Sequence, residues 1–206
     1  MSRYMGTAVK RVEDPRFLRG QGKYVANLSL PGMAYVAVKR SPLAHATING
    51  IETSEAEALD GVIGVYTGQD LLDGGASFAC GSLPCGFTPP DIVTPSHNPV
   101  AVDKVRHVGD AIAVVVAESP YIAEDALDLI DVDLEPLPVV VDARSAIDDD
   151  APLVHDDVGT NLSFHWPLGD EDEVNQALSD SDHVVELEFV NQRLIANAME
   201  PRACAA

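Results

Sequence analysis

The sequence predicts an α+β domain with a mixed sheet, and three neighbouring segments carry that prediction. Ala111–Ala117 is an unbroken apolar run with consecutive valines, which indicates a strand buried on both faces. Ser119 and Pro120 then form a helix start, because a capping residue precedes proline at the first helical position. Apolar residues recur at helical spacing as far as Leu129, and residues 130–134 alternate apolar with acidic, as in a half-buried strand. These segments form one compact unit on which the rest of the chain must pack.

The preceding part of the chain adds shorter elements of both kinds. Further strands are expected at residues 33–38, 47–53, 62–67 and 100–105. Asn49 and Gly50 mark a possible break in the second of them. Ser54 is expected to cap a short helix over residues 55–59, with Glu57 at the capping-box position. Residues 69–72 are interpreted as the start of a loop.

A long irregular stretch follows, over residues 73–99, punctuated by glycine and proline. A loop of this length in a compact domain is usually functional, an insertion or a partner contact. Cys80 and Cys85 lie in it as a C-x4-C pair, with His97 nearby. Zinc sites usually need a second pair or spaced histidines, so two free thiols are the favoured interpretation over a metal site.

The last third of the chain begins with an acidic segment. Asp148, Asp149 and Asp150, together with residues 155–157, could hold a hard cation through their carboxylates. They lack the alternating spacing of a calcium loop, which favours a solvated linker and a domain boundary. Beyond it we expect an extended segment at 161–166, a helix at 169–178 and a strand at 183–190.

Two local features of the N-terminal part could indicate a binding site, but for each of them an ordinary structural role is favoured. Residues 19–24 are glycine-rich and basic, but they lack the strand and helix that a phosphate-binding loop requires, so a turn is favoured. His45 is interpreted as a hydrogen-bonded loop residue rather than a ligand. Residues 1–24 as a whole are expected to form an extended arm.

The composition excludes several classes of function. A formal net charge of −20 argues against nucleic acid and against anionic membrane surfaces. No segment reaches the roughly 20 apolar residues of a membrane span, and the N-terminus lacks the apolar core of a signal peptide. Three cysteines, an odd number, suit a reducing compartment. These observations predict a cytoplasmic protein.

A set of short motifs runs along nearly the whole chain: VKRVEDPRFLRGQGKY (9–24), LPGM (30–33), RSPLAHA (40–46), GVIGVYT (61–67), HVGD (107–110), AEDA (123–126), DVDLEPLP (131–138), NQRL (191–194) and MEPR (199–202). In these motifs and in their order the chain resembles the molybdenum hydroxylase large subunits, the family of carbon monoxide dehydrogenase, xanthine dehydrogenase and aldehyde oxidase. The last two motifs are similar to the carbon monoxide dehydrogenase type of large subunit.

The resemblance implies an α/β hammerhead domain followed by the truncated start of a molybdopterin-binding domain. The implied division is an N-terminal arm at 1–24, the hammerhead domain at 25–142, a linker at 143–160 and the start of the first molybdopterin-binding domain at 161–206. The family's molybdenum site uses a glutamine-containing segment, a Gly-Gly-Phe-Gly loop and a basic glutamate, all expected well after Arg202. No catalytic, cofactor-binding or metal-binding residue is therefore assigned in this chain.

The implied full-length protein is a molybdenum-dependent oxidoreductase that hydroxylates carbon monoxide, an aldehyde or an N-heterocycle with oxygen from water. The implied cofactor is molybdenum–molybdopterin cytosine dinucleotide. Electrons would pass to an iron–sulfur small subunit and an FAD medium subunit, in a dimer of heterotrimers. The 206-residue chain alone is expected to bind no cofactor and to be inactive. The alternative is a non-catalytic acidic scaffold or binding module, which the missing site and the charge of −20 support.

Overall fold

The computed structural model describes residues 6–75, 92–95, 97–192, 194–198, 200 and 202–206. Its contacts divide the chain into two units, Met1–Met33 with Ser181–Ala206, and Ala34–Asp180. The strands are β1 Tyr35–Arg40, β2 Ala46–Glu52, β3 Val62–Thr67, β4 Lys104–Val105, β5 Ala111–Ala117 and β6 Asp131–Pro136. The helices are α1 Asp14–Leu18, α2 Ser54–Glu57, α3 Gly68–Asp73, α4 Pro120–Asp128 and α5 Glu171–Ser179, with 3-10 turns at Val25–Asn27 and Ser145–Ile147.

The larger unit is built on two three-stranded sheets, ordered β1-β5-β3 and β4-β2-β6. The α+β class is confirmed, and β5 is the inner strand of its sheet. The prediction that β5 is buried on both faces was wrong, because Ala113, Val115 and Ala117 are buried on one face whereas Val114 and Val116 on the other are only half-buried. The prediction of one mixed sheet was wrong, because each pair of strands among the described residues is antiparallel. The physical reason is that α4 does not return the chain beside β5. It delivers β6 to the second sheet, where β6 pairs with β2.

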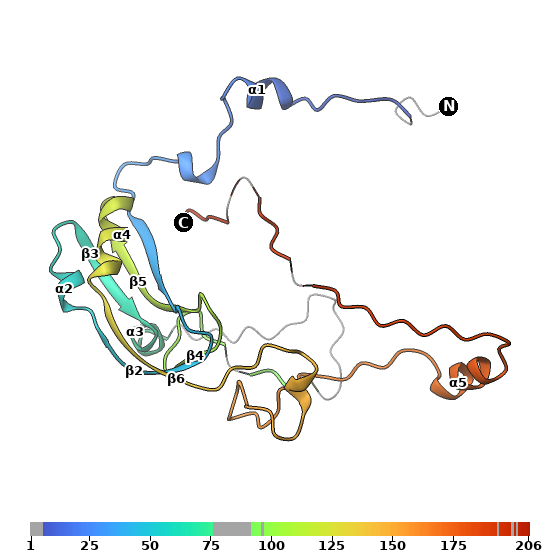
Figure 1. The fold of residues 1–206 in the computed structure, drawn as a ribbon. Helices are drawn as coiled ribbons and strands as arrows, with labels where there is room; N and C mark the ends of the chain where they lie inside the picture. Colours follow the sequence, from blue (N-terminus) through green and yellow to red (C-terminus); the bar gives the residue numbers. More distant parts are fainter. Residues whose placement is uncertain (1–5, 76–91, 96, 193, 199, 201) are drawn as a thin grey trace. The chain divides into compact units, whose positions relative to one another are not determined.

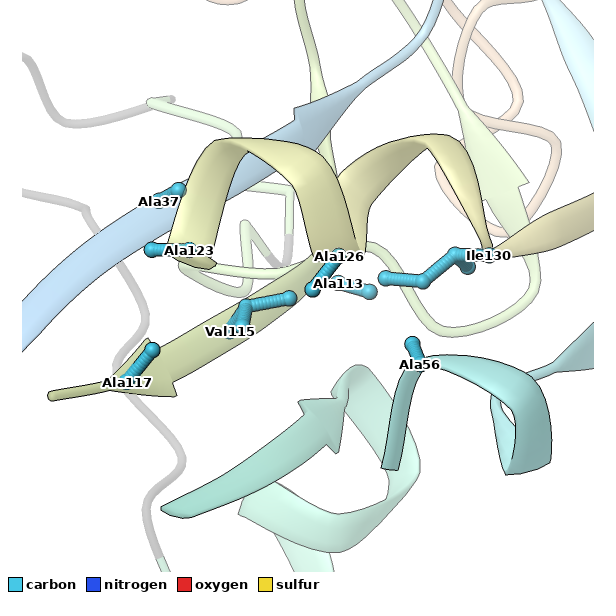
Figure 2. Close-up of a cluster of buried hydrophobic side chains, with 8 residues drawn as sticks. All are labelled: Ala37, Ala56, Ala113, Val115, Ala117, Ala123, Ala126 and Ile130. Atoms are coloured by element: carbon cyan, nitrogen blue, oxygen red, sulfur yellow. The ribbon is translucent and has the colours of Figure 1, made fainter. Parts of the chain in front are cut away.

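The core lies between α4 and one face of the β1-β5-β3 sheet (Figure 1). Figure 2 shows that Ala113, Val115 and Ala117 of β5 turn toward the helix residues Ala123 and Ala126. Alanine at these positions lets the helix backbone approach the sheet closely. A second cluster, around Val105 and Ile112, packs against the other sheet. At about 25 cal/mol per Å² of buried apolar surface, these clusters are the main source of stability.

Local signals set most of the element boundaries. The Ser119 hydroxyl accepts a hydrogen bond from the Ile122 amide at 3.2 Å, and Pro120 opens α4, as predicted. A register shift between Ile48 and Gly50 interrupts β2 where the break was expected. Gly61 turns the chain into β3 with φ of 88°, which favours glycine.

Several predicted elements differ in the structure. Residues 69–72 are not a loop but lie in α3, which begins with a reciprocal cap. The Asp70 amide donates to the Thr67 hydroxyl, and the Asp70 carboxylate accepts from the Thr67 amide at 2.7 Å. The Thr67 hydroxyl also donates to the Asp70 carboxylate at 2.6 Å, and this bond, followed by the one from the Thr67 amide, lowers the pKa of Asp70. The cap of α2 is Thr53 rather than Ser54, and the Thr53 hydroxyl donates to Glu57.

Further differences concern residues 100–105, the N-terminal arm and residues 183–190. The expected strand at 100–105 is reduced to β4, since Ala101 instead donates its amide to Ala111. The arm is not wholly extended, because residues 14–18 form the short helix α1 with Pro15 in its first turn. Residues 183–190 are not a strand, and all of them are exposed. The helix expected at 169–178 is confirmed as α5, whose cap Asp170 accepts from the Glu173 amide.

Candidate functional site

A polar pocket of about 200 Å³ lies beside β4 in the larger unit. It lies between β4, the turn that follows it, and the segment around Val154. Three of the chain's six histidines line it. The lining residues are His97, Asn98, Ala101, Val102, Asp103, Lys104, Arg106, His107, Asp110, Val154 and His155.

The turn between β4 and β5 fixes one wall of this pocket. Gly109 adopts φ of 87°, and its amide donates to the Ser41 carbonyl at 2.8 Å. The Ser41 amide in turn donates to the Asp110 carbonyl at 2.8 Å, which ties the turn to the end of β1. The buried Asp110 carboxylate accepts from the Arg106 amide at 2.9 Å, and the His107 Nδ1 lies 3.6 Å from it. Asp110 is therefore a structural cap of the turn.

The two cationic residues of the pocket, Lys104 and Arg106, bind the segment around Val154 that forms the opposite wall. Lys104 pairs with Asp156, and the hydrogen bond from Lys104 lowers the pKa of that carboxyl. The Arg106 Nε donates to the Val154 carbonyl at 3.2 Å, and its Nη1 lies 3.7 Å from the Asp103 carboxylate. Both positive charges are thus already matched within the chain.

The histidines differ in their surroundings. Burial, and then the positive charge of Arg106, lowers the pKa of His155 below its usual 6.5, so its imidazole is neutral at neutral pH. The His97 and His107 rings meet edge to face, with centroids 6.4 Å apart. Imidazoles could hold or move a proton here. However, no group of three or more His, Cys, Asp or Glu among the described residues could hold a metal ion.

A more apolar pocket of about 300 Å³ adjoins the first one, and Val154 and His155 line both. Asn161 organises its walls. The Asn161 Nδ2 donates to the carbonyls of Ala146 and Pro152, each at 2.9 Å, and its Oδ1 accepts from the Val154 amide at 3.0 Å. Ser163 also bonds to Val93 through both backbone and side chain.

The residues considered in the sequence analysis are scattered rather than gathered at one site. His45 is a buried loop residue, and because its Nδ1 lies 2.8 Å from the Pro138 carbonyl, Nδ1 is the donor; this interpretation is confirmed. Gly20 ends α1 in a turn with φ of 68°, which is the plainer reading of residues 19–24. Asp148, Asp149 and Asp150 are exposed. Cys80 and Cys85 lie outside the described residues, and Cys204 is exposed with a free thiol.

Sequence reasoning did not single out Arg106 or Asn161, although they hold the pocket walls together. Arg106 bonds to backbone carbonyls 48 and 2 residues away along the chain, and Asn161 bonds to three separate backbone groups. No periodic pattern marks such residues. The role of Asp110 in the turn could have been predicted, because Gly109 before it indicates a turn at this position.

The implied molybdopterin dinucleotide does not fit these residues. A pocket of about 200 Å³ is smaller than the roughly 300–1,000 Å³ typical for ligands of drug size. Its cations are matched by carboxylates, so they offer no free charge to a pyrophosphate. We therefore derive no catalytic step from this pocket. No helix in the described part of the chain is long and apolar enough to cross a bilayer.

Comparisons with known proteins agree with this architecture. The family described as "Aldehyde oxidase and xanthine dehydrogenase, a/b hammerhead domain" matches residues 19–138. The carbon monoxide dehydrogenase large chain of Afipia carboxidovorans is 34% identical over 98% of this chain and 25% of its own length. The nicotine 6-hydroxylase large subunit of Paenarthrobacter nicotinovorans is 36% identical over 98% of this chain and 24% of its own length.

Solved structures give the same result. The crystal structure of a Cu,Mo-CO dehydrogenase superposes with a TM-score of 0.72 at 35% identity, over 87% of this chain and 23% of that one. Quinoline 2-oxidoreductase from Pseudomonas putida 86 gives 0.69 at 38% identity, over 77% and 20%. The chain thus spans about a quarter of the length of these relatives. On the family match, the fold and these relatives, the chain belongs to the aldehyde oxidase and xanthine dehydrogenase family and carries its α/β hammerhead domain.

Proposed function

We propose that this chain is the N-terminal portion of the large subunit of a molybdenum-dependent hydroxylase or dehydrogenase. The observation that carries the proposal is that nearly all of this chain aligns with only about a quarter of each relative. Two relatives, the large chain of a carbon monoxide dehydrogenase and that of a nicotine hydroxylase, align with 98% of this chain but only 25% and 24% of themselves. The substrate of the whole protein would be carbon monoxide, an aldehyde or an N-heterocycle, oxidised with oxygen from water.

The domain division proposed for the subunit places the N-terminal arm at 1–24, the hammerhead domain at 25–142, a linker at 143–160 and the start of a molybdopterin-binding domain at 161–206. Residues 161–206 bury little surface of their own, which is the property expected of an incomplete domain. We place the cofactor contacts in residues after 206, because the polar pocket beside β4 is too small for the group and its cations are already paired.

The finer assignments follow the same reasoning. We propose molybdenum–molybdopterin cytosine dinucleotide as the cofactor, an iron–sulfur small subunit and an FAD medium subunit as partners, a dimer of heterotrimers as the assembly, and the cytoplasm as its location. When bound, the molybdenum cofactor supplies the two-electron oxidation of the substrate. The residues of this chain would contribute the scaffold and would hold no reacting atom.

The decisive experiment is to read the gene beyond the codon for Ala206 and to purify its product under mild conditions. We expect an open frame roughly three times longer than this segment, by comparison with the relatives, and a Gly-Gly-Phe-Gly loop within it. The product should carry molybdenum, iron and flavin in fixed ratios. A stop codon directly after Ala206, with no matching frame nearby, would contradict the proposal and favour the acidic scaffold.

Expression of residues 1–206 alone gives a second test. This polypeptide should contain no stoichiometric molybdenum by elemental analysis, and should reduce no dye with carbon monoxide, an aldehyde or a purine. About one molybdenum per chain would mean that the cofactor site lies within these residues, against the assignment made above.

A further inference from the structure

The β1-β5-β3 sheet has one face covered by α4 and another whose side chains are exposed or half-buried in the described part of the larger unit. Residues paired across strands share a face. Val36 pairs with Val116, and Val38 with Val114, on β1 and β5. On the other side of β5, Gly64 pairs with Val116, and Tyr66 with Val114. We call the surface formed by these side chains the outer face: Val36, Val38, Gly64, Tyr66, Val114 and Val116.

The outer face carries no charged residue, although the chain has a net charge of −20. Val36 is 64% exposed and Tyr66 is 43% exposed. The hydroxyl end of Tyr66 lies over Gly64, where a Cβ would meet the hydroxyl oxygen at 2.9 Å and two ring carbons at 3.1 Å, so the tyrosine side chain covers the gap left by the glycine. The result is an uncharged, mostly apolar surface across three strands. Such surfaces on soluble proteins mark interfaces.

We propose that the outer face is an interface, and that it packs against the part of the same large subunit that follows residue 206. This inference rests on the proposed function. The covering surface should itself be apolar and uncharged, because an unpaired charge buried against these valines would be strongly unfavourable.

Two observations favour this occupant over a second copy of the chain. The relatives contain about three times as much polypeptide again as the part that matches, and this polypeptide is held at high effective concentration by the covalent link. A second copy would bring another charge of −20 against the first. Repulsion between two chains of this net charge opposes self-association.

The test measures thiol labelling at the outer face of the long subunit. Val36→Cys places a reporter on the exposed edge strand β1, and Tyr66→Cys places a second one on β3. Tyr121→Cys is the matched control, since Tyr121 lies on α4 in the layer that covers the sheet's other face and is 81% exposed. A soluble maleimide is added to the native and to the urea-unfolded subunit, and peptide mass spectrometry resolves each position.

We expect the thiols introduced by Val36→Cys and Tyr66→Cys to react at least about tenfold more slowly in the native subunit than in the unfolded one, while the thiol of the Tyr121→Cys control changes little. Equal reactivity of the Val36→Cys and Tyr121→Cys thiols in an intact long subunit would overturn the interface without affecting the proposed function. Protection lost when the partner subunits are removed, or on dilution, would assign the face to another subunit or a second copy and overturn the chosen occupant. A gene that ends at residue 206 would overturn the proposed function first.

Discussion

Two segments of this chain have the same sequence pattern and different structures. Asp131–Pro136 and residues 183–190 both alternate acidic and apolar side chains. The first is β6, which pairs with β2 and places Val132 and Leu134 against the core. The second is exposed throughout, and its Phe189 is 82% exposed. Alternation therefore defines a face, but only a partner strand and a covering layer turn that face into a core.

The sharpest test of this comparison places a charge in each region. Val115→Asp should lower the free energy of unfolding by roughly 3–5 kcal/mol, because Val115 is fully buried beneath α4 and the carboxylate would have no partner. Val185→Asp is the control, and its effect should stay within about 0.5 kcal/mol. Urea unfolding monitored by circular dichroism gives both values. A soluble Val115→Asp variant with an unchanged midpoint would refute the placement of β5.

Alanine substitutions at Gly68 and Gly50 compare a glycine in close contact with backbone and a glycine next to open space. A Cβ at Gly68 would lie 2.3 Å from the Ala101 carbonyl oxygen, so Gly68→Ala should cost about 1–3 kcal/mol of stability. Gly50 has nothing within 4 Å of its Cβ position. Gly50→Ala should therefore be neutral or stabilise by about 0.5 kcal/mol. Thermal unfolding of the two variants side by side checks the difference, and equal midpoints would contradict the contact at Gly68.

The caps of α4 and α5 should differ in their effect on stability. Ser119→Ala removes the cap of α4, which packs on the sheet, and should cost about 1 kcal/mol of global stability. Asp170→Ala removes the equivalent cap of α5, which buries no side chain. It should lower helix content while leaving global stability within about 0.5 kcal/mol. A global loss as large as that of Ser119→Ala would mean that α5 packs in the folded unit.

The smallest expected effect is on pH dependence, around His155. Its pKa is lowered in the folded chain by burial and by Arg106, from the usual 6.5. The unfolded state therefore binds the proton more tightly, so the stabilisation is complete above pH 6.5 and declines as the pH falls toward the folded pKa. Hydrogen exchange of amides 154–161 at about pH 7.5 and about pH 5.5 should detect this loosening.

His155→Gln is the control, and it should remove that pH dependence. A magnetic resonance titration of the imidazole should give a midpoint below 6.5. A midpoint at or above that value would show that His155 is not buried beside Arg106 as the structure places it.

Local chemistry allowed much of the hammerhead domain to be predicted. Serine followed by proline fixed the start of α4, the valine run fixed β5 to the residue, and the alternation located β6 to within two residues. The family resemblance was readable because its motifs recur in order along the chain, and the relatives confirm it. The cap of α3 was also visible in Thr67 and Asp70, but its significance was missed.

What the tertiary structure decided was every pairing over long distances in the chain. No local signal distinguishes a β6 that returns beside β5 from one that joins β2, since both bury Val132 and Leu134. The geometry of α4 on the first sheet makes that choice. Likewise, Arg106 and Asn161 took their roles from backbone groups far along the chain. The sequence by itself determined where strands and helices can form and which face of each is apolar, whereas only the packed structure determined which of those faces meet, because that depends on partners the local sequence does not contain.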